Sequence, residues 1–225
     1  GVAVLIIVSS VMNGFEQELK DRVLNVIPHA SIYGLNPIDD WESVENNLRE
    51  DANIRGISPY IETEALIKSK SAVAGVLVNG VIASRDKSVS VIHEFMQTGN
   101  FENIQKDNNI ILGRLLARKL NVDVGDKISL MLPDTSSSFA GYFPRSKVFN
   151  ISGVFNIGSK DIDETLAYIS LENASILTGL KNQVHGFRLK FDDLFEAPYL
   201  VWQSLIFAEK NSNALLNAED WSYTY

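Results

Sequence analysis

The feature that most constrains the fold is a series of short apolar segments separated by turn residues and helical patterns. Short runs rich in Val, Ile, Phe and Tyr are typical of β-strands, whereas apolar residues spaced three and four positions apart are typical of helices. The segments that predict strands are 29–33, 54–69, 72–83, the start of 110–120, 128–132, 149–155, 166–169 and 184–191. The segments that predict helices are 41–48, 89–96, the end of 110–120, 172–177 and 197–209. This order predicts an α+β fold.

Several residues refine the expected boundaries. A turn at 34–37 should end the first strand, and Ser58 with Pro59 should interrupt 54–69, because proline has no N–H to donate. Asp39 or Asp40 is expected to cap the helix that begins at Trp41.

Glycines mark three further places. Gly75 and Gly80 indicate bulges or close backbone contacts within 72–83. Gly125 belongs to a tight turn at 121–127 that leads into the next strand, and Gly179 ends the helix at 172–177.

The order of elements also predicts how the chain is divided. We find no internal repeat and no low-complexity linker. Residues 28–83 and 183–225 are expected to form one α+β subdomain, in which a helix covers one face of a sheet. Residues 84–182 are expected to form a second, β-rich subdomain inserted into the first.

The N-terminus carries a continuous apolar run from Val2 to Val8. A membrane-spanning helix needs about 20 such residues, so this run alone does not span a membrane. It fits either a buried strand or the end of a transmembrane helix. The following residues 11–26 have apolar side chains at helical spacing, which predicts an amphipathic helix that ends before Pro28.

Composition excludes several classes of function. The formal net charge of −8 argues against broad nucleic-acid binding, which normally requires a basic surface. The absence of cysteine excludes disulfides and cysteine-ligated zinc. The three histidines, His29, His93 and His185, lack the spacing of metal ligands, so no metal site is expected.

No motif for catalysis is present, so we expect neither an enzyme nor a cofactor. The chain lacks the nucleophile elbow G-x-S-x-G, the phosphate-binding P-loop and a cysteine nucleophile. The acidic run 161–164 could bind calcium or act in acid–base chemistry, but it lacks the ligand spacing of a calcium loop. Solvated surface is the favoured interpretation. Asp192 and Asp193 are expected to precede the helix at 197–209.

The most unusual stretch connects the strands at 128–132 and 149–155. Its first part, 133–138, is polar, its middle gathers the aromatics Phe139, Tyr142 and Phe143, and Arg145 and Lys147 follow. Its position predicts a long hairpin or protruding loop near 133–148. Either the aromatics fold back onto the core, or they form an exposed apolar tip that binds a partner.

Several motifs resemble those of one family of bacterial transport proteins, the LolC/LolE family within the wider MacB/FtsX-like superfamily. Residues 8–19 (VSSVMNGFEQEL) resemble the junction that follows the first transmembrane helix of these proteins, and 75–81 resembles their central strand. Residues 110–120 with 124–127 resemble their I-x-L-G-x-x-L-A-x-x-L and V-G-D segments, and 149–155 resembles F-x-V-x-G-x-F. The resemblance covers nearly the whole chain.

The resemblance implies a fold and a location. The fold is a MacB-type periplasmic domain with a porter-like α+β subdomain and an inserted, sabre-like β-rich subdomain. Residues 1–27 would be the end of a transmembrane helix and a stalk helix. The domain would lie in the periplasm and be attached to the inner membrane.

The resemblance also implies a function and a set of partners. Such proteins are ABC-transporter permease subunits that release outer-membrane lipoproteins from the inner membrane and pass them to the periplasmic carrier LolA. The other implied partners are the cytoplasmic ATPase LolD, a second permease subunit of the LolC/LolE pair, and the lipoprotein substrate.

In the LolC branch, a protruding hairpin called the hook recruits the carrier, and its position corresponds here to 136–147. The aromatic tip would enter the apolar cavity of the carrier, and the basic residues would pair with acidic groups at its rim. The residues implied in this contact are Phe139, Tyr142, Phe143, Pro144, Arg145 and Lys147.

Two related functions remain open from the sequence. One is a MacB-like mechanotransmission domain that binds an efflux adaptor. The other is an FtsX-like domain that binds a cell-wall hydrolase activator. The M-N-G-F junction at 12–15 favours lipoprotein release over both.

Overall fold

A computed structural model describes residues 28–133, 145–210 and 214–223, together with Val2, Val4, Val8–Ser10 and Met12. The described positions before residue 13 are helical and have exposed side chains, which disfavours a buried strand there. None of the helices in these ranges has the length and hydropathy that crossing a membrane requires. Most of the amphipathic segment expected at 11–26 lies outside the described residues.

The strands form one sheet of ten. They are β1 (Ala30–Ile38), β2 (Ile54–Lys68), β3 (Val73–Val81), β4 (Met96–Gly99), β5 (Asn109–Gly113), β6 (Lys127–Met131), β7 (Ser146–Phe155), β8 (Leu166–Ser170), β9 (Val184–Phe191) and β10 (Leu216–Asp220). The α-helices are α2 (Trp41–Leu48), α3 (Ala83–Asp86), α4 (Arg114–Leu120), α5 (Lys160–Thr165), α6 (Leu171–Thr178) and α7 (Ala197–Glu209). The 3₁₀-helices are η1 (Ile92–Phe95), η2 (Phe101–Gln105), η3 (Leu194–Glu196) and η4 (Trp221–Tyr223).

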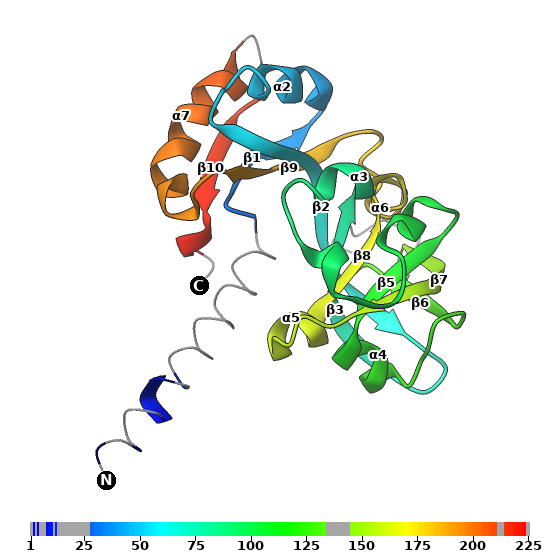
Figure 1. The fold of residues 1–225 in the computed structure, drawn as a ribbon. Coiled ribbons are helices and arrows are strands. Elements are labelled where there is room, and N and C mark those ends of the chain that lie inside the picture. Colours follow the sequence, from blue (N-terminus) through cyan, green and yellow to red (C-terminus); the bar gives the residue numbers. More distant parts are fainter. Residues whose placement is uncertain are drawn as a thin grey trace.

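The two ends of the described chain build a two-layer lobe. Its antiparallel strands lie in the order β10-β1-β9-β2, and α2 and α7 cover one face (Figure 1). Together with the connections β1-α2-β2 and β9-α7-β10, this is the ferredoxin-like split β-α-β arrangement. The core between the layers includes Ile32, Leu48, Phe187 and Val201, all fully buried.

The second lobe is a closed barrel. Strand β2 pairs with β9 through its first half and with β3 through its second half, so it belongs to both lobes. From β3 the pairing continues through β8, β5, β7 and β6, and β6 returns to β2, where Leu66 faces Met131. Alternate residues of each strand point inward, including Ile61, Ile110 and Phe149. Closure leaves these strands without the free edges that would invite aggregation.

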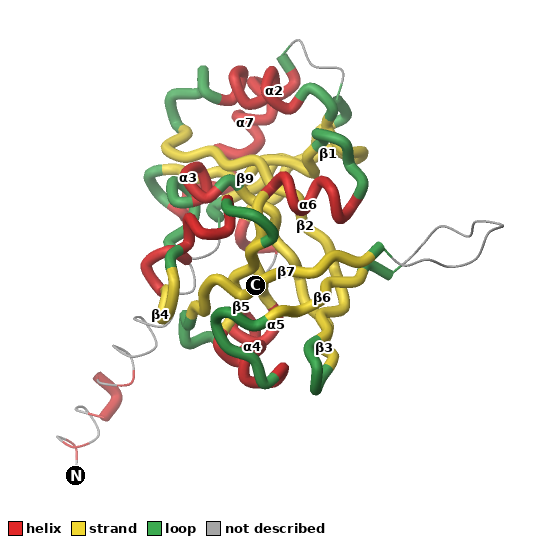
Figure 2. The backbone as a smooth tube through the Cα atoms, turned by 90° about the vertical axis from the view of Figure 1, so that its right-hand side faces the viewer, coloured by secondary structure: helices red, strands yellow, loops and turns green. Residues whose placement is uncertain are grey.

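Helices close and flank the barrel. Leu116 and Leu120 of α4 and Leu177 of α6 join its interior. A third core cluster, which includes Phe101, Phe155 and Tyr168, packs η1, η2, α3 and α5 against the outside of the barrel strands. Figure 2 shows the lobes stacked, with α2 and α7 at one end and α4 and α5 at the other.

Most predicted elements are confirmed, several with identical bounds, such as β9 and α7. The expected turn at 34–37 is wrong, because β1 continues to Ile38 with an irregularity in its pairing to β9 after Tyr33. The expected break at Pro59 is also wrong. Pairing of β2 with β3 begins only at Tyr60, so the missing N–H of Pro59 interrupts no bond to that strand.

Three further expectations need correction. The 89–96 region contains only the short 3₁₀-helix η1, and Met96 already begins β4, so the expected helix over 89–96 is wrong. No Asp side chain caps α2; the Asp39 carboxylate instead accepts a hydrogen bond from Gln183 at 2.6 Å. The sequence did not predict strands β4 and β10. For β10, the segment LNAED at 216–220 is too polar to indicate a strand without its partner β1.

Candidate partner-binding site

The segment expected to protrude is the connection of an antiparallel hairpin made by β6 and β7. Met131 pairs with Ser146, and the Leu132 N–H donates to the Arg145 carbonyl at 3.0 Å. Both strands belong to the barrel, so the hairpin begins on a rigid support. The predicted strands on either side of this segment are confirmed.

Arg145 lies at the base of the hairpin and contacts α6. Its guanidinium donates through Nη1 to the Thr178 carbonyl at the C-terminal end of that helix. A Cβ added at Gly179 would lie 2.1 Å from this nitrogen, so glycine gives the guanidinium room to approach. A cation at the C-terminus of a helix is favoured by the helix dipole. The Arg145 residue as a whole remains exposed.

Lys147 makes a second link between the hairpin and α6. Its Nζ donates to Asn173 Oδ1 at 2.6 Å and lies 5.7 Å from the centre of the Phe149 ring. Partial burial lowers the pKa of Lys147, and the nearby Glu172 opposes that effect. Asn173 also donates to the Asp107 carbonyl at 2.8 Å, so one amide joins three segments.

The six residues implied by the family resemblance therefore fall into two groups. Arg145 and Lys147 are described and bind α6 within the chain. The tip residues Phe139, Tyr142, Phe143 and Pro144 lie outside the described residues.

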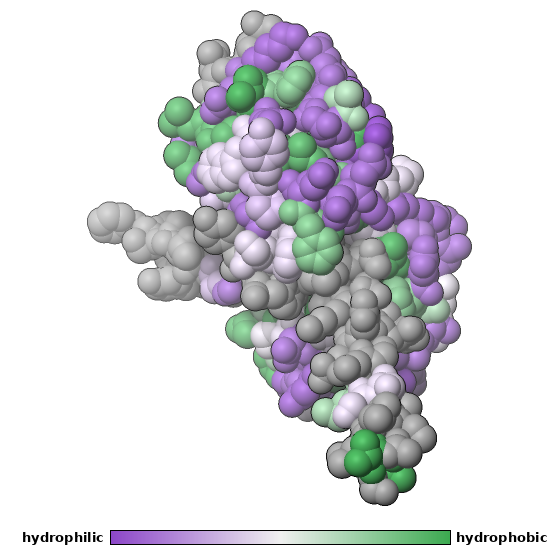
Figure 3. Space-filling view, turned by 60° about the vertical axis from the view of Figure 1, so that its left-hand side comes forward, coloured by the Kyte–Doolittle hydropathy of each residue, from purple (hydrophilic) through white to green (hydrophobic). Residues whose placement is uncertain are grey.

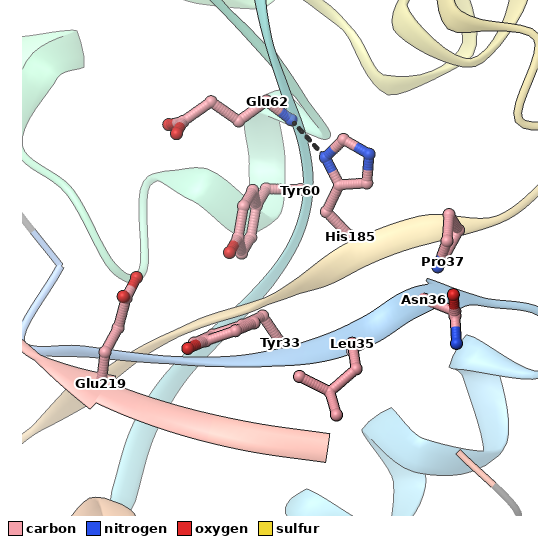
Figure 4. A pocket seen from close by; sticks show the side chains of 9 residues that line it. Tyr33, Leu35, Asn36, Pro37, Tyr60, Glu62, His185 and Glu219 are labelled. Carbon is pink, nitrogen blue, oxygen red and sulfur yellow. Dashed lines mark hydrogen bonds between the residues drawn. The ribbon is translucent and has the colours of Figure 1, made fainter. Parts of the chain in front are cut away.

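A polar cavity of about 370 Å³ opens on the face of the two-layer sheet that α2 and α7 leave uncovered. Figure 4 shows Glu219 at one side, Glu62 and His185 at the other, and the rings of Tyr33 and Tyr60 between them. Tyr33 and Tyr60 come from β1 and β2, and both pair with Gly186 of the intervening β9. A Cβ on Gly186 would lie 2.9 Å from the Cβ of Tyr33, so glycine at this position leaves room for the Tyr33 side chain.

A buried charged group contacts two of the residues that line this cavity. Arg188 of β9 donates to Glu62 Oε2 at 3.1 Å and to Asn79 Oδ1 at 2.5 Å. Its guanidinium lies 4.9 Å from the centre of the Tyr60 ring. Burial raises the pKa of the Tyr60 hydroxyl, although Arg188 opposes this effect.

The pKa values of His185 and Glu219 shift in opposite directions. The Nδ1 of His185 accepts the Glu62 backbone N–H at 3.2 Å, and burial lowers the pKa of this histidine, so the ring is neutral. Burial, Glu62 and Asp220 raise the pKa of Glu219. Among the described residues Glu219 has no ion pair.

The acidic run at 161–164 has a structural role that the sequence interpretation missed. Asp163 is buried, and its two oxygens accept the backbone N–H groups of Ile157 and Gly158, each at 2.9 Å. Glu164 pairs with Lys119 at 2.7 Å. Within the described ranges, no group of three His, Asp or Glu side chains is placed to hold a metal ion.

Comparisons with known proteins show which family has this architecture. The sequence model of the MacB-like periplasmic core domain matches residues 1–195. The chain belongs to this family. Among solved structures, the extracellular domain of the ABC-type transporter YknZ from Gram-positive bacteria is 10% identical with a TM-score of 0.54, over 84% of this chain and 98% of that one. The periplasmic region of MacB from Actinobacillus actinomycetemcomitans is also 10% identical, with a TM-score of 0.53, over 87% of this chain and 89% of that one. The predicted α+β fold of MacB type is confirmed.

Curated relatives confirm the resemblance to LolC and LolE. The lipoprotein-releasing system transmembrane protein LolC of Neisseria meningitidis serogroup B is 35% identical, over 100% of this chain and 54% of that protein. LolC of Xylella fastidiosa is 34% identical over 88% of this chain and 48% of that protein. LolE of Haemophilus influenzae is 34% identical over 88% of this chain and 49% of that protein. The chain thus spans about half the length of these relatives.

Proposed function

We propose that this chain is the periplasmic domain of an inner-membrane ABC-transporter permease subunit that releases outer-membrane lipoproteins and transfers them to LolA. The support is membership of the MacB-like family together with whole-chain similarity to proteins named as lipoprotein-releasing. In this proposal residues 1–27 link the domain to the inner membrane. The domain itself has no catalytic role, because the energy comes from ATP hydrolysis by the separate subunit LolD.

The site proposed for LolA is the β6–β7 hairpin. The observation that carries this assignment is the fixed base of the hairpin, which two barrel strands and two side-chain bonds to α6 hold in place. A rigid base lowers the entropy cost of presenting a loop to a partner. The connection at 133–144 carries Phe139, Tyr142, Phe143 and Pro144, the residues proposed to enter the carrier.

Apolar burial would supply most of the binding energy. Two aromatic side chains that each bury about 150 Å² would contribute several kcal/mol at about 25 cal/mol per Å², before the costs of association. The exposed Arg145 can pair with an acidic group at the rim of the carrier while it keeps one bond to Thr178. Lys147 is half-buried, so its main contribution is to hold the base through Asn173, with a weaker contact to the rim.

The remaining partners follow from the same assignment. A second permease subunit of the LolC/LolE pair would complete the membrane part of the transporter, and LolD would bind it on the cytoplasmic side. The lipoprotein substrate would pass from the inner membrane toward the carrier held by the hairpin.

Isothermal titration calorimetry of this chain with purified LolA tests the proposal. We expect a Kd on the order of micromolar, and loss of binding in the triple variant Phe143→Ala/Pro144→Gly/Arg145→Ala. Circular dichroism should show an unchanged fold in the variant. Phe195→Ala is the matched control, because it removes an aromatic side chain that is 73% exposed and lies beside α7 on the other lobe.

The outcomes separate the related functions. Equal binding by the triple variant would overturn the hairpin assignment but keep the carrier as partner. No binding by the unmodified chain would exclude a LolC-like recruitment role and leave a LolE-like role. Binding to a hexameric efflux adaptor or a hydrolase activator, with none to LolA, would favour the MacB- or FtsX-like alternative.

A further inference from the structure

The cavity between Tyr33, Tyr60, Glu62 and Glu219 lies on the two-layer lobe, and the hairpin belongs to the barrel lobe. We propose that this cavity is a binding site for a basic side chain, lysine or arginine, of a partner protein. The proposal does not depend on the assignment of the hairpin to LolA.

The first argument is charge. Glu62 and Glu219 both line the cavity, and of these two carboxylates Arg188 pairs with that of Glu62. Glu219 has no ion pair in the described part of the chain, and His185 is neutral because its Nδ1 accepts the Glu62 N–H. The side chains that line the cavity therefore include a carboxylate without an ion-pair partner among the described residues and no Lys or Arg, which favours a positively charged occupant.

The second argument is the aromatic lining. Tyr33 and Tyr60 pair with Gly186 from the two neighbouring strands, and their rings lie between the two carboxylates (Figure 4). Aromatic rings beside a carboxylate favour a guanidinium or ammonium group over a hydrated metal ion. Arg188 makes an interaction of this kind, with its guanidinium 4.9 Å from the centre of the Tyr60 ring. In the described ranges no three His, Asp or Glu side chains are placed to hold a metal ion.

The third argument is access. The cavity opens where the pairing of β1 with β9 becomes irregular, between Tyr33 and Ile38. Leu35, at its rim, is 64% exposed. Irregular pairing of this kind is common beside binding sites, because it separates the strands and re-aims side chains. The cavity volume of about 370 Å³ accommodates one long side chain rather than a folded domain.

An NMR titration of the 225-residue chain tests the site, with N-acetyl-arginine amide and N-acetyl-lysine amide as probes. We expect saturable shifts confined to the tyrosine rings and amides around the cavity, with a Kd on the order of millimolar for at least one probe. N-acetyl-citrulline amide has nearly the shape of the arginine probe without its charge, and it should bind at least about tenfold more weakly.

Variants at two positions of the cavity test where the probe binds. Glu219→Gln should weaken binding of the arginine probe at least about tenfold. Glu209→Gln, at an exposed position of α7 away from the cavity, should leave binding unchanged. Leu35→Lys should occupy the cavity from within the chain and block the probe. Equal binding of citrulline and arginine, shifts spread over the surface, or equal loss in the Glu209 control would overturn the proposal. Selective loss in Glu219→Gln would support it.

Discussion

The Arg188 guanidinium lies 4.0 Å from the Asp86 carboxylate, and both groups are buried where the two lobes meet. Arg188 belongs to β9 of the two-layer lobe, whereas Asp86 ends α3 beside the barrel. Both Asp86 oxygens lack a hydrogen-bond partner among the described residues. Burial raises the pKa of Asp86 to about 6, although Arg188 opposes the shift.

This arrangement predicts a pH dependence of stability. Because the folded-state pKa of Asp86 is raised, its stabilising contribution is complete below the unfolded value of 3.8 and is lost as pH rises through about 6. Relative to the unmodified protein, Asp86→Asn should therefore become more stable between pH 4 and pH 7. The gain should approach about 3 kcal/mol, since one pKa unit corresponds to about 1.4 kcal/mol. Urea unfolding of both proteins at several pH values measures it.

The difference between the two proteins is the informative quantity, because His29 and His185 titrate in both and their effects cancel. A difference that stays constant from pH 4 to pH 7 would show that Asp86 is charged throughout. Arg188 would then be a full ion-pair partner of Asp86.

Arg188 itself should be essential for stability. Arg188→Met removes the hydrogen bonds to Glu62 and Asn79 and leaves Asp86 without its nearest cation. Loss of one partner from a buried charge group costs about 3–5 kcal/mol. Thermal or urea unfolding at pH 7 should show this loss. Adding Asp86→Asn should recover part of it, because the double variant leaves no isolated carboxylate there.

Arg55→Met is the control for Arg188→Met. Arg55 forms a bidentate pair with Asp192, but both side chains are more than half exposed, so its removal should leave stability nearly unchanged. If the two variants lose similar stability, burial does not set the importance of these pairs.

Much of the fold could be predicted from local sequence patterns. The apolar run at 184–191 and the helical pattern at 197–209 have the predicted bounds because their packing faces are encoded within each segment. β10 could not be predicted, because its stability comes from pairing with β1, about 180 residues earlier in the chain. Closure of the barrel through the pairing of β6 with β2 is likewise a relation between distant segments.

The candidate sites also have a part that local sequence patterns predict and a part that depends on distant segments. Aromatic and basic residues close together in sequence indicated the hairpin, and the structure confirms the strands that support it. The intramolecular bonds of Arg145 and Lys147 to α6 were not predictable, since no pattern places 171–178 beside 145–147. Tyr33, Glu62, His185 and Glu219 form no motif, and only the strand order brings them together.

Asp163 should be important for folding and unimportant for metal binding. Its buried carboxylate accepts the backbone N–H groups of Ile157 and Gly158, so Asp163→Ala removes both bonds and should cost roughly 2–4 kcal/mol. Glu164→Gln, which affects an exposed pair with Lys119, is the control and should change stability little. Differential scanning fluorimetry with millimolar calcium should show no stabilisation. A rise in Tm of several degrees with calcium would instead indicate a cation site at 161–164.

Two glycines of β3 provide a test of how closely α6 packs on the barrel. A Cβ at Gly80 would lie 2.1 Å from the Cβ of Ala174, whereas a Cβ at Gly75 would meet nothing within 4 Å. Gly80→Ala should therefore destabilise the protein by about 1–3 kcal/mol through overpacking. Gly75→Ala should be neutral or slightly stabilising, because it only reduces the freedom of the unfolded chain.

The cause of the Gly80→Ala loss can be checked with a second substitution. Ala174→Gly removes the opposing methyl group, so the double variant Gly80→Ala/Ala174→Gly should regain most of the lost stability, apart from about 1 kcal/mol for glycine within a helix. Urea unfolding of the single and double variants gives the coupling energy. If the two substitutions are additive, the loss in Gly80→Ala arises elsewhere, and the contact between β3 and α6 is looser than the structure shows.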